Sequence, residues 1–148
     1  MNANAVNIFM YGLFMDESLL NSLGVHPTQA TVGHVEGFDL HIGKRATLLP
    51  AANSRAYGVL MKITAAEVAT LYADESLADY VAEPVAVTLP GGTRVAAVCY
   101  ILPATKLAGT NSEYAAALLA SATRLGFPEG YLERIRHAAA GPGVGGAS

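Results

Sequence analysis

The apolar residues of this chain fall into short strand-like runs separated by helix-like stretches. Residues 6–11 are mostly bulky and apolar and stop at Gly12, a pattern typical of a buried strand that ends in a tight turn. From Asp16 to Leu23 the spacing becomes helical, with acidic residues at the start and Gly24 as the stop. An abrupt sequence of strand, turn and helix is therefore predicted near the N-terminus.

Strand patterns dominate the next part of the chain. Residues 31–42 alternate loosely between apolar and polar positions and include Gly37, which predicts bent strands or a bulge. Two more strands are expected at 46–50 and 56–63, on either side of the turn-like segment 51–55. Glycines within these runs would permit strong curvature of the sheet that the strands form.

The clearest local signal is a capping box. Thr64 and Glu67 form the pattern T-x-x-E, which predicts that a helix begins at Thr64 and continues through residues 65–76. Further on, the apolar runs 81–89 and 94–102 flank a Pro-Gly-Gly segment. That arrangement predicts a β-hairpin with a glycine turn.

Helical spacing returns in the last third of the chain. A helix is expected from about Asn111 to Gly126, and Pro128 suits the first position of a second helix. The tail 141–148 is rich in Gly, Ala and Pro and is expected to be disordered, which leaves 1–140 as a single domain. Strands mixed with helices in this order predict an α+β fold, with the sheet curled into a small barrel.

Composition then narrows the function. The chain has 148 residues, a formal net charge of −3 and no dense basic run, which argues against nucleic acid and anionic membranes as partners. A small, weakly charged ligand fits better. The first residues lack the features of a signal peptide and no apolar run is long enough to span a bilayer, so we expect a cytoplasmic protein.

Most familiar catalytic motifs are absent. His26, His34, His41 and His137 follow no metal-binding spacing, so a metal site is not expected. The single cysteine, Cys99, lies between apolar residues, where a buried hydrophobic role is commoner than a nucleophilic one. There is no Walker loop, no G-x-G-x-x-G after a strand and no G-x-S-x-G. Carboxylates and tyrosines remain as the candidates.

These candidates concentrate in residues 71–80. The segment contains Tyr72, Asp74, Glu75, Asp79 and Tyr80. Charged residues at a helix end are usually solvated, so an ordinary surface is one interpretation. Acidic groups at a helix C-terminus, however, face the negative end of the helix dipole, which raises a carboxyl pKa and calls for another reason for their presence.

Together, several segments resemble a known family. They are "YGLFM" after the first strand, "YGVLMKI" before the capped helix, "LYADES" at its end, the hairpin "VAVTLPGGTRVAAVCYIL" and the final "SEYAAALLASATRLGFPEGYLERI". Their order and spacing are similar to those of the γ-glutamylcyclotransferase family and its AIG2-like relatives, up to about Ala140. The resemblance implies a small mixed β-barrel flanked by helices.

The resemblance also implies roles for particular residues. Glu75 matches the catalytic glutamate of the family's L-x-x-x-E stretch, and Tyr131 matches the tyrosine of its G-x-P-x-x-Y stretch. The substrate-binding residues that it implies are Tyr11, Gly12, Leu13, Phe14, Tyr80 and Tyr131. Backbone N–H groups of the turn that follows Tyr11 would hold the substrate's α-carboxylate.

The implied reaction needs no cofactor. In a γ-glutamyl peptide or γ-glutamyl amine, the α-amine can attack the γ-carbonyl, close a five-membered ring and release 5-oxoproline together with an amine or amino acid. Folding the substrate into that geometry can contribute about 7–11 kcal/mol. Glu75, with its pKa raised towards neutrality, would act as the general acid and base.

Other interpretations stay open at this point. Where family members have Ser-Asn, this chain has Leu13-Phe14, which leaves only backbone donors in the turn. Tyr11, Phe14 and Tyr131 could all be core residues, and Tyr80 could simply begin a strand. A relative that binds a small metabolite without catalysis, or a protein interaction module, would then be the function.

Overall fold

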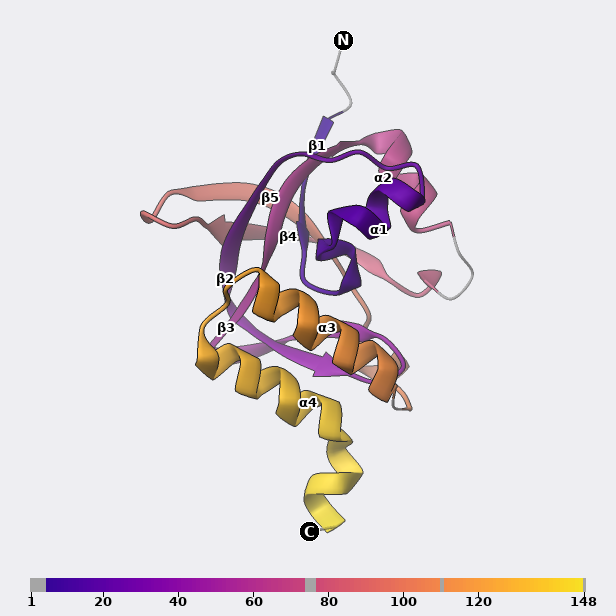
Figure 1. Cartoon of the computed structure of the whole chain (residues 1–148), viewed down its shortest axis with the longest axis vertical. Coiled ribbons are helices and arrows are strands. Elements are labelled where there is room, and N and C mark those ends of the chain that lie inside the picture. The colour runs from indigo at the N-terminus through magenta and orange to yellow at the C-terminus, as the bar shows by residue number, and fades with distance from the viewer. Residues whose placement is uncertain (1–4, 74–76, 110, 148) are drawn as a thin grey trace.

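The structure is a computed structural model that describes residues 5–73, 77–109 and 111–147, with side chains as far as Ala138. Five strands are present: β1 (Ala5–Met10), β2 (Thr28–Ile42), β3 (Ala46–Thr64), β4 (Val81–Thr88) and β5 (Arg94–Ile101). The helices are α1 (Glu17–Ser22), α2 (Ala65–Leu71), α3 (Ser112–Arg124) and α4 (Glu129–Ala147), with short 3₁₀ turns at η1 (Leu13–Met15) and η3 (Ala104–Lys106). Figure 1 shows their arrangement.

The strands close into a barrel in the order β1-β3-β2-β4-β5. Neighbouring strands are antiparallel except β1 and β5, which run parallel and are in register at Ile8 and Val98. The sequence-based prediction of a mixed barrel in an α+β fold is therefore confirmed. Apolar side chains from all five strands fill the interior, and Ile8, Leu40 and Val87 are fully buried.

The long strands β2 and β3 bend, as the glycines in the sequence predict. Gly37 has a φ of +83° and lies at a register shift between Glu36 and Phe38. The prediction of two strands at 46–50 and 56–63 was wrong, because β3 runs through both as one strand. Strand β3 pairs with β2 both before and after the irregular residues, at Pro50 and at Arg55. The hydrogen bonds between the two strands therefore outweigh the local turn signal.

Helix α2 begins as predicted and ends earlier than predicted. The Thr64 hydroxyl accepts from the Glu67 N–H (3.0 Å), and the Glu67 carboxylate accepts from the Thr64 N–H (2.8 Å), so both halves of the capping box form. The helix stops at Leu71, and Tyr72 leaves the helical conformation to stack on Tyr100. A tertiary aromatic contact, which helix propensity cannot foresee, sets this end.

The remaining turns follow the sequence closely. Gly91 and Gly92 have φ values of +97° and +96° in the β4–β5 hairpin, and Asn111 caps α3. Pro128 caps α4 instead of occupying its first turn, since its carbonyl accepts from the N–H of Leu132 (3.1 Å). The expected disorder of residues 141–148 stays a prediction.

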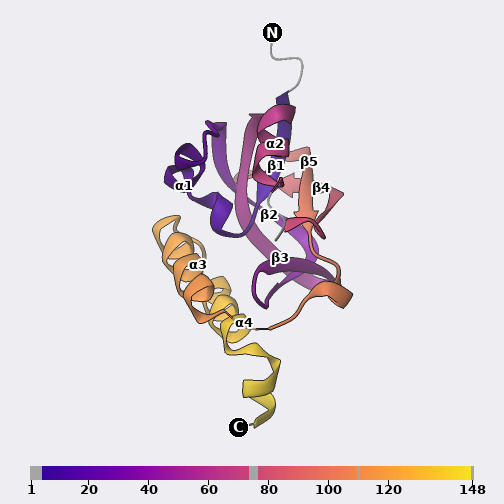
Figure 2. The ribbon, with the colours of Figure 1, turned by 90° about the vertical axis from the view of Figure 1, so that its right-hand side faces the viewer.

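Helices α3 and α4 lie side by side against the barrel, as Figures 1 and 2 show. Helix α4 packs on β2, and the Arg134 guanidinium donates from Nε and Nη2 to the two Asp39 carboxylate oxygens, at 2.6 Å each. In the described part of the chain, no helix combines the length and the apolar character needed to cross a bilayer.

Candidate active site

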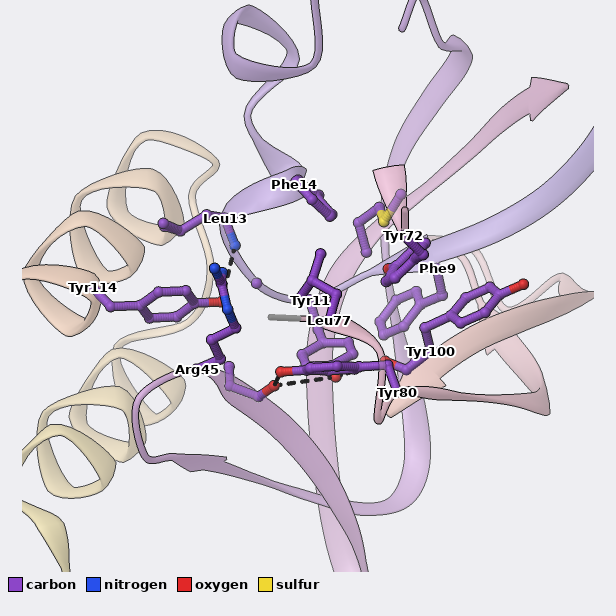
Figure 3. Close-up of a pocket in the computed structure, with 13 residues that line it drawn as sticks. Phe9, Tyr11, Leu13, Phe14, Arg45, Tyr72, Leu77, Tyr80, Tyr100 and Tyr114 are labelled. Carbon is purple, nitrogen blue, oxygen red and sulfur yellow. Dashed lines mark hydrogen bonds between the residues drawn. The ribbon is translucent and has the colours of Figure 1, made fainter. Parts of the chain in front are cut away.

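A cavity of about 50 Å³ lies where β1 ends, and Figure 3 shows the side chains around it. Its walls are Phe9, Met10, Tyr11, Gly12, Leu13, Phe14, Arg45, Ala46, Tyr72, Leu77, Tyr80, Tyr100 and Tyr114. These residues come from β1 and the turn that follows it, from the junction before β3 and its first residue, from the two sides of residues 74–76, from β5 and from α3. Segments far apart in the sequence therefore meet at one end of β1.

The turn after β1 is held on both sides. The Tyr11 hydroxyl donates to the Tyr100 carbonyl (2.7 Å), which ties the end of β1 to β5. After Gly12, the Met15 N–H donates to the Gly12 carbonyl (3.0 Å), which closes the 3₁₀ turn η1. The abrupt turn seen in the sequence is thus a fixed wall of the cavity.

Gly12 is needed for a close approach from α3. The Tyr114 hydroxyl accepts a hydrogen bond from the Leu13 N–H at 3.4 Å. A Cβ atom on residue 12 would lie only 2.5 Å from the Tyr114 hydroxyl oxygen, a distance that real Cβ atoms do not tolerate. Glycine therefore lets the α3 tyrosine reach the backbone of the turn.

Tyrosine hydroxyls gather around one carbonyl group. The Ala46 carbonyl accepts from the Tyr80 hydroxyl at 2.5 Å and from the Tyr11 hydroxyl at 3.4 Å. Burial raises the pKa of Tyr11, Tyr80 and Tyr114 above the ordinary value. These hydroxyls are consequently neutral at physiological pH and serve as hydrogen-bond donors and acceptors.

The opposite wall is aromatic. The rings of Tyr72 and Tyr100 stack with centroids 4.3 Å apart, and Phe14 meets Tyr72 edge-on at 5.9 Å. Tyr80 continues this group, with its ring centroid 6.4 Å from that of Tyr72. The cavity thus has a wall of hydroxyls near Ala46 and a wall of ring faces opposite, which suits a ligand with one polar and one less polar end.

Arg45 is the charged side chain among the described residues that line the cavity. It directly precedes β3 in a turn where the Gly43 N–H donates to the Arg45 carbonyl (2.9 Å). The same turn is fastened to the segment before α3, because the Lys44 N–H donates to the Ala108 carbonyl (2.9 Å). The backbone that carries Arg45 is therefore fixed on two sides.

Five of the residues expected at the site come together in this cavity. They are Tyr11, Gly12, Leu13, Phe14 and Tyr80. Tyr131 does not join them: it is buried between α4 and the barrel, with its ring centroid 5.1 Å from Tyr57 and 5.8 Å from Phe127. Glu75 lies outside the described residues.

Sequence reasoning missed several lining residues. Arg45 lies in no quoted motif, and Tyr100 and Tyr114 lie in segments that carry the family resemblance but were given no role, although the Asn111 cap could have placed Tyr114 in the first turn of a helix. Tyr72 was noted only as part of a polar cluster. No group of three or more His, Cys, Asp or Glu side chains that could hold a metal occurs within the described part of the chain.

Comparison with known families agrees with the fold. The family model for gamma-glutamyl cyclotransferase, AIG2-like proteins matches residues 8–117. The chain belongs to this family. The matched range includes the second half of β1, the turn that follows it and Tyr114, and ends before α4. No curated protein sequence matches the chain.

Solved structures show the family fold at low sequence identity. A gamma-glutamyl cyclotransferase is 17% identical with a TM-score of 0.73, and the match covers 89% of this chain and 86% of the other. An uncharacterized human protein is 18% identical with a TM-score of 0.72, over 90% and 87% of the two chains. An AIG2-like protein of Mus musculus is 19% identical with a TM-score of 0.57, over 74% and 90%.

Proposed function

We propose that this family member catalyses an intramolecular cyclotransfer, releasing 5-oxoproline from a γ-glutamyl peptide or γ-glutamyl amine. The observation that carries the proposal is the cavity at the end of β1, walled by the Tyr11–Phe14 turn and by tyrosine hydroxyls. These features can bind an extended molecule that has a carboxylate at one end and an amide near its middle.

A carboxylate must be brought to this cavity for the reaction. Among the described residues that line it, none is acidic, while Tyr72 and Leu77 on either side of residues 74–76 both line it. The family resemblance of the L-x-x-x-E stretch names Glu75 as the general acid and base, and the described residues on either side of it support this assignment because they line the cavity.

The proposed reaction is balanced by three proton transfers. Glu75 takes a proton from the α-ammonium and releases it to solvent, and the freed α-amine attacks the γ-carbonyl carbon to form the ring C–N bond. Glu75 then takes a second proton from the ring nitrogen, which bond formation leaves positively charged, and gives it to the leaving nitrogen as the amide C–N bond breaks. A partly dry cavity raises the pKa of a carboxyl group, which favours these transfers near neutral pH.

The substrate is held by groups already present in the cavity. The N–H of Leu13 donates a long hydrogen bond to the Tyr114 hydroxyl (3.4 Å), and the α-carboxylate can replace this hydroxyl as the acceptor. The hydroxyls of Tyr80 and Tyr11 donate to backbone carbonyls, so their oxygen atoms can accept hydrogen bonds from the glutamyl group, and Phe14 can close the site beside the leaving group. Because the reaction is intramolecular, this positioning supplies most of the rate enhancement.

The decisive test compares the wild type with Glu75→Gln. The assay measures 5-oxoproline by mass spectrometry, with glutathione, γ-glutamyl dipeptides and γ-glutamyl amines as substrates. We expect the variant to lose about 10²-fold or more in kcat, the usual contribution of a general acid and base, while its circular dichroism spectrum is unchanged. Asp79→Asn is the matched control, since Asp79 is exposed on the same segment and should keep full activity.

A second function is favoured by one observation. Phe14 occupies a wall position where family members have Asn, and its ring packs edge-on against Tyr72 instead of offering a hydrogen bond. This suits a protein that binds a γ-glutamyl metabolite without converting it. Binding of the same compounds with no 5-oxoproline release by folded wild type would support this function and reject the enzyme.

A further inference from the structure

We propose that Arg45 is a specificity-determining residue whose guanidinium binds a carboxylate of the substrate. The inference rests on the proposed function and deepens it, because it names the chemical class of substrate: an anionic γ-glutamyl compound whose carboxylate reaches the polar side of the cavity. Arg45 belongs to no motif that the sequence analysis singled out.

The position of Arg45 supports this role. It is half-buried and supplies the positive charge among the described side chains that line the cavity. Figure 3 shows its side chain beside Tyr114 and directed towards the Leu13 turn. Tyr80 and Tyr114 line the same cavity as Arg45, and burial raises the pKa of both hydroxyls, which keeps them neutral.

Arg45, Tyr80, Tyr114 and the Leu13 N–H therefore form one polar corner of the cavity. The Tyr80 hydroxyl donates to the Ala46 carbonyl, the Tyr114 hydroxyl accepts from the Leu13 N–H, and the guanidinium supplies charge. A carboxylate in this corner can accept from the guanidinium N–H groups and from the Tyr114 O–H. Arginine can also bind both carboxylate oxygens at once, which fixes the orientation as well as the charge.

The rest of the cavity determines the orientation of the bound substrate. The stacked rings of Tyr72 and Tyr100, together with Phe14, offer no charged group opposite this corner. A γ-glutamyl compound bound with a carboxylate at Arg45 would place its apolar carbon atoms along these rings. The carboxylate could be the α-carboxylate of the glutamyl group or the carboxylate of a leaving amino acid.

Binding of unreactive probes tests the inference separately from catalysis. Glutaryl-alanine lacks the α-amine and cannot close the ring, but it keeps both carboxylates. Glutaryl-ethylamide keeps only the carboxylate on the glutamyl side, and pentanoyl-alanine keeps only the carboxylate on the alanine side. Dissociation constants are measured by calorimetry for the wild type, Arg45→Gln, Arg45→Lys and the control Arg55→Gln. Arg55 lies on β3, the strand that directly follows Arg45, and pairs with Glu36 at the surface.

We expect Arg45→Gln to weaken glutaryl-alanine binding by roughly 10-fold to 100-fold, the range for hydrogen bonds to charged groups. Arg45→Lys should recover part of this loss, because lysine keeps the charge but lacks the paired N–H donors that bind both carboxylate oxygens. Arg55→Gln should bind the probes like the wild type. If Arg45→Gln weakens the binding of glutaryl-ethylamide but not of pentanoyl-alanine, Arg45 binds the glutamyl carboxylate. Loss confined to pentanoyl-alanine assigns the leaving group's carboxylate.

Equal dissociation constants in the wild type and Arg45→Gln for all three probes would overturn the inference, as would a wild type that binds none of them. The inference would also be overturned if Arg45→Gln binds the probes as the wild type does but converts γ-glutamyl-alanine with a lower kcat and a shifted pH dependence of kcat. In that case Arg45 acts through the catalytic carboxylate. If the wild type binds the probes and Arg45→Gln weakens that binding, but the wild type does not convert γ-glutamyl-alanine, the proposed enzyme is rejected and the inference about Arg45 stands.

Discussion

At the scale of single residues, the approach of Tyr114 to Gly12 connects two distant parts of the chain. Gly12 follows the first strand, the N–H of the next residue, Leu13, donates to the Tyr114 hydroxyl, and Tyr114 comes from a helix about a hundred positions later. The glycine could be noticed in the sequence because it interrupts an apolar run. Its partner could not, because nothing local links a tyrosine in α3 to the end of β1.

Gly12→Ala should therefore weaken both the fold and the site. The new Cβ would lie 2.5 Å from the Tyr114 hydroxyl oxygen, so the ring must move and its contact with Leu13 is lost. We expect a destabilisation of about 1–3 kcal/mol, typical of overpacking, measured from the urea unfolding midpoint.

A second substitution makes this prediction specific. Tyr114→Phe removes the oxygen that blocks the Cβ, so the Gly12→Ala/Tyr114→Phe double variant should recover a large part of the lost stability. Gly130→Ala is the control, because a Cβ there meets no other atom within 4 Å. A double variant whose losses simply add would show that the clash is not the cause.

At the scale of elements, helix α4 is fastened to the barrel by a charged pair. Arg134 on α4 donates both hydrogen bonds to Asp39 on β2, at 2.6 Å each. Partial burial raises the pKa of Asp39, but the hydrogen bonds and charge of Arg134 outweigh it and leave that pKa below the ordinary value. The folded state therefore holds this carboxylate ionised more firmly than the unfolded chain does.

Asp39→Asn should destabilise the protein by about 1–2 kcal/mol near neutral pH. The low end of the range for charged hydrogen bonds applies because the Arg134 side chain is 36% exposed. Since the folded pKa is lowered, the contribution of the wild-type pair is complete above the unfolded pKa of about 3.9 and disappears as the pH falls through the folded pKa.

Urea unfolding midpoints of the wild type and Asp39→Asn are compared at about pH 6 and about pH 2. The difference between the two proteins should be clear at the higher pH and small at the lower one. Glu36→Gln is the control, because it breaks an exposed pair with Arg55 and should change the midpoint little. A difference that is the same at both pH values would show that Asp39 acts through packing instead of charge.

Elements with local signals were predictable from the sequence. The capping box of Thr64 and Glu67 and the glycine turn of the β4–β5 hairpin both formed, since each depends on a few neighbouring residues. The single long strand β3 was not predictable, because its continuity depends on pairing with β2. Residues 51–55 look like a turn when the partner strand is unknown.

At the scale of the whole molecule, the barrel brings together residues that no motif connects. The turn after β1 and Tyr80 were foreseen at the cavity because the family resemblance supplied them, whereas Arg45 and Tyr100 emerged only from the closed strand order. Tyr131 shows the opposite case, since it matches a family motif but is packed between α4 and the barrel. Sequence patterns therefore indicate elements better than they indicate the composition of a cavity.

Buried tyrosines predict how the whole molecule responds to alkali. Burial raises the pKa of Tyr11, Tyr80 and Tyr131 above the ordinary 10.0. Because the folded pKa is raised, stability is complete below pH 10.0 and declines above it as the unfolded chain ionises. We expect tyrosinate absorbance to rise together with the loss of near-ultraviolet circular dichroism. Substantial ionisation of these tyrosines before that loss would contradict the prediction.

The place of Cys99 has a practical consequence. It is fully buried on β5, next to Val98, which is in register with Ile8 where β1 and β5 close the barrel. Burial raises its pKa to about 12, so the thiol stays protonated and shielded while the barrel is closed. Because Cys99 is the chain's single cysteine, thiol labelling of the wild-type protein reports on this one position. The labelling rate of this thiol therefore measures how often the first and last strands of the barrel separate.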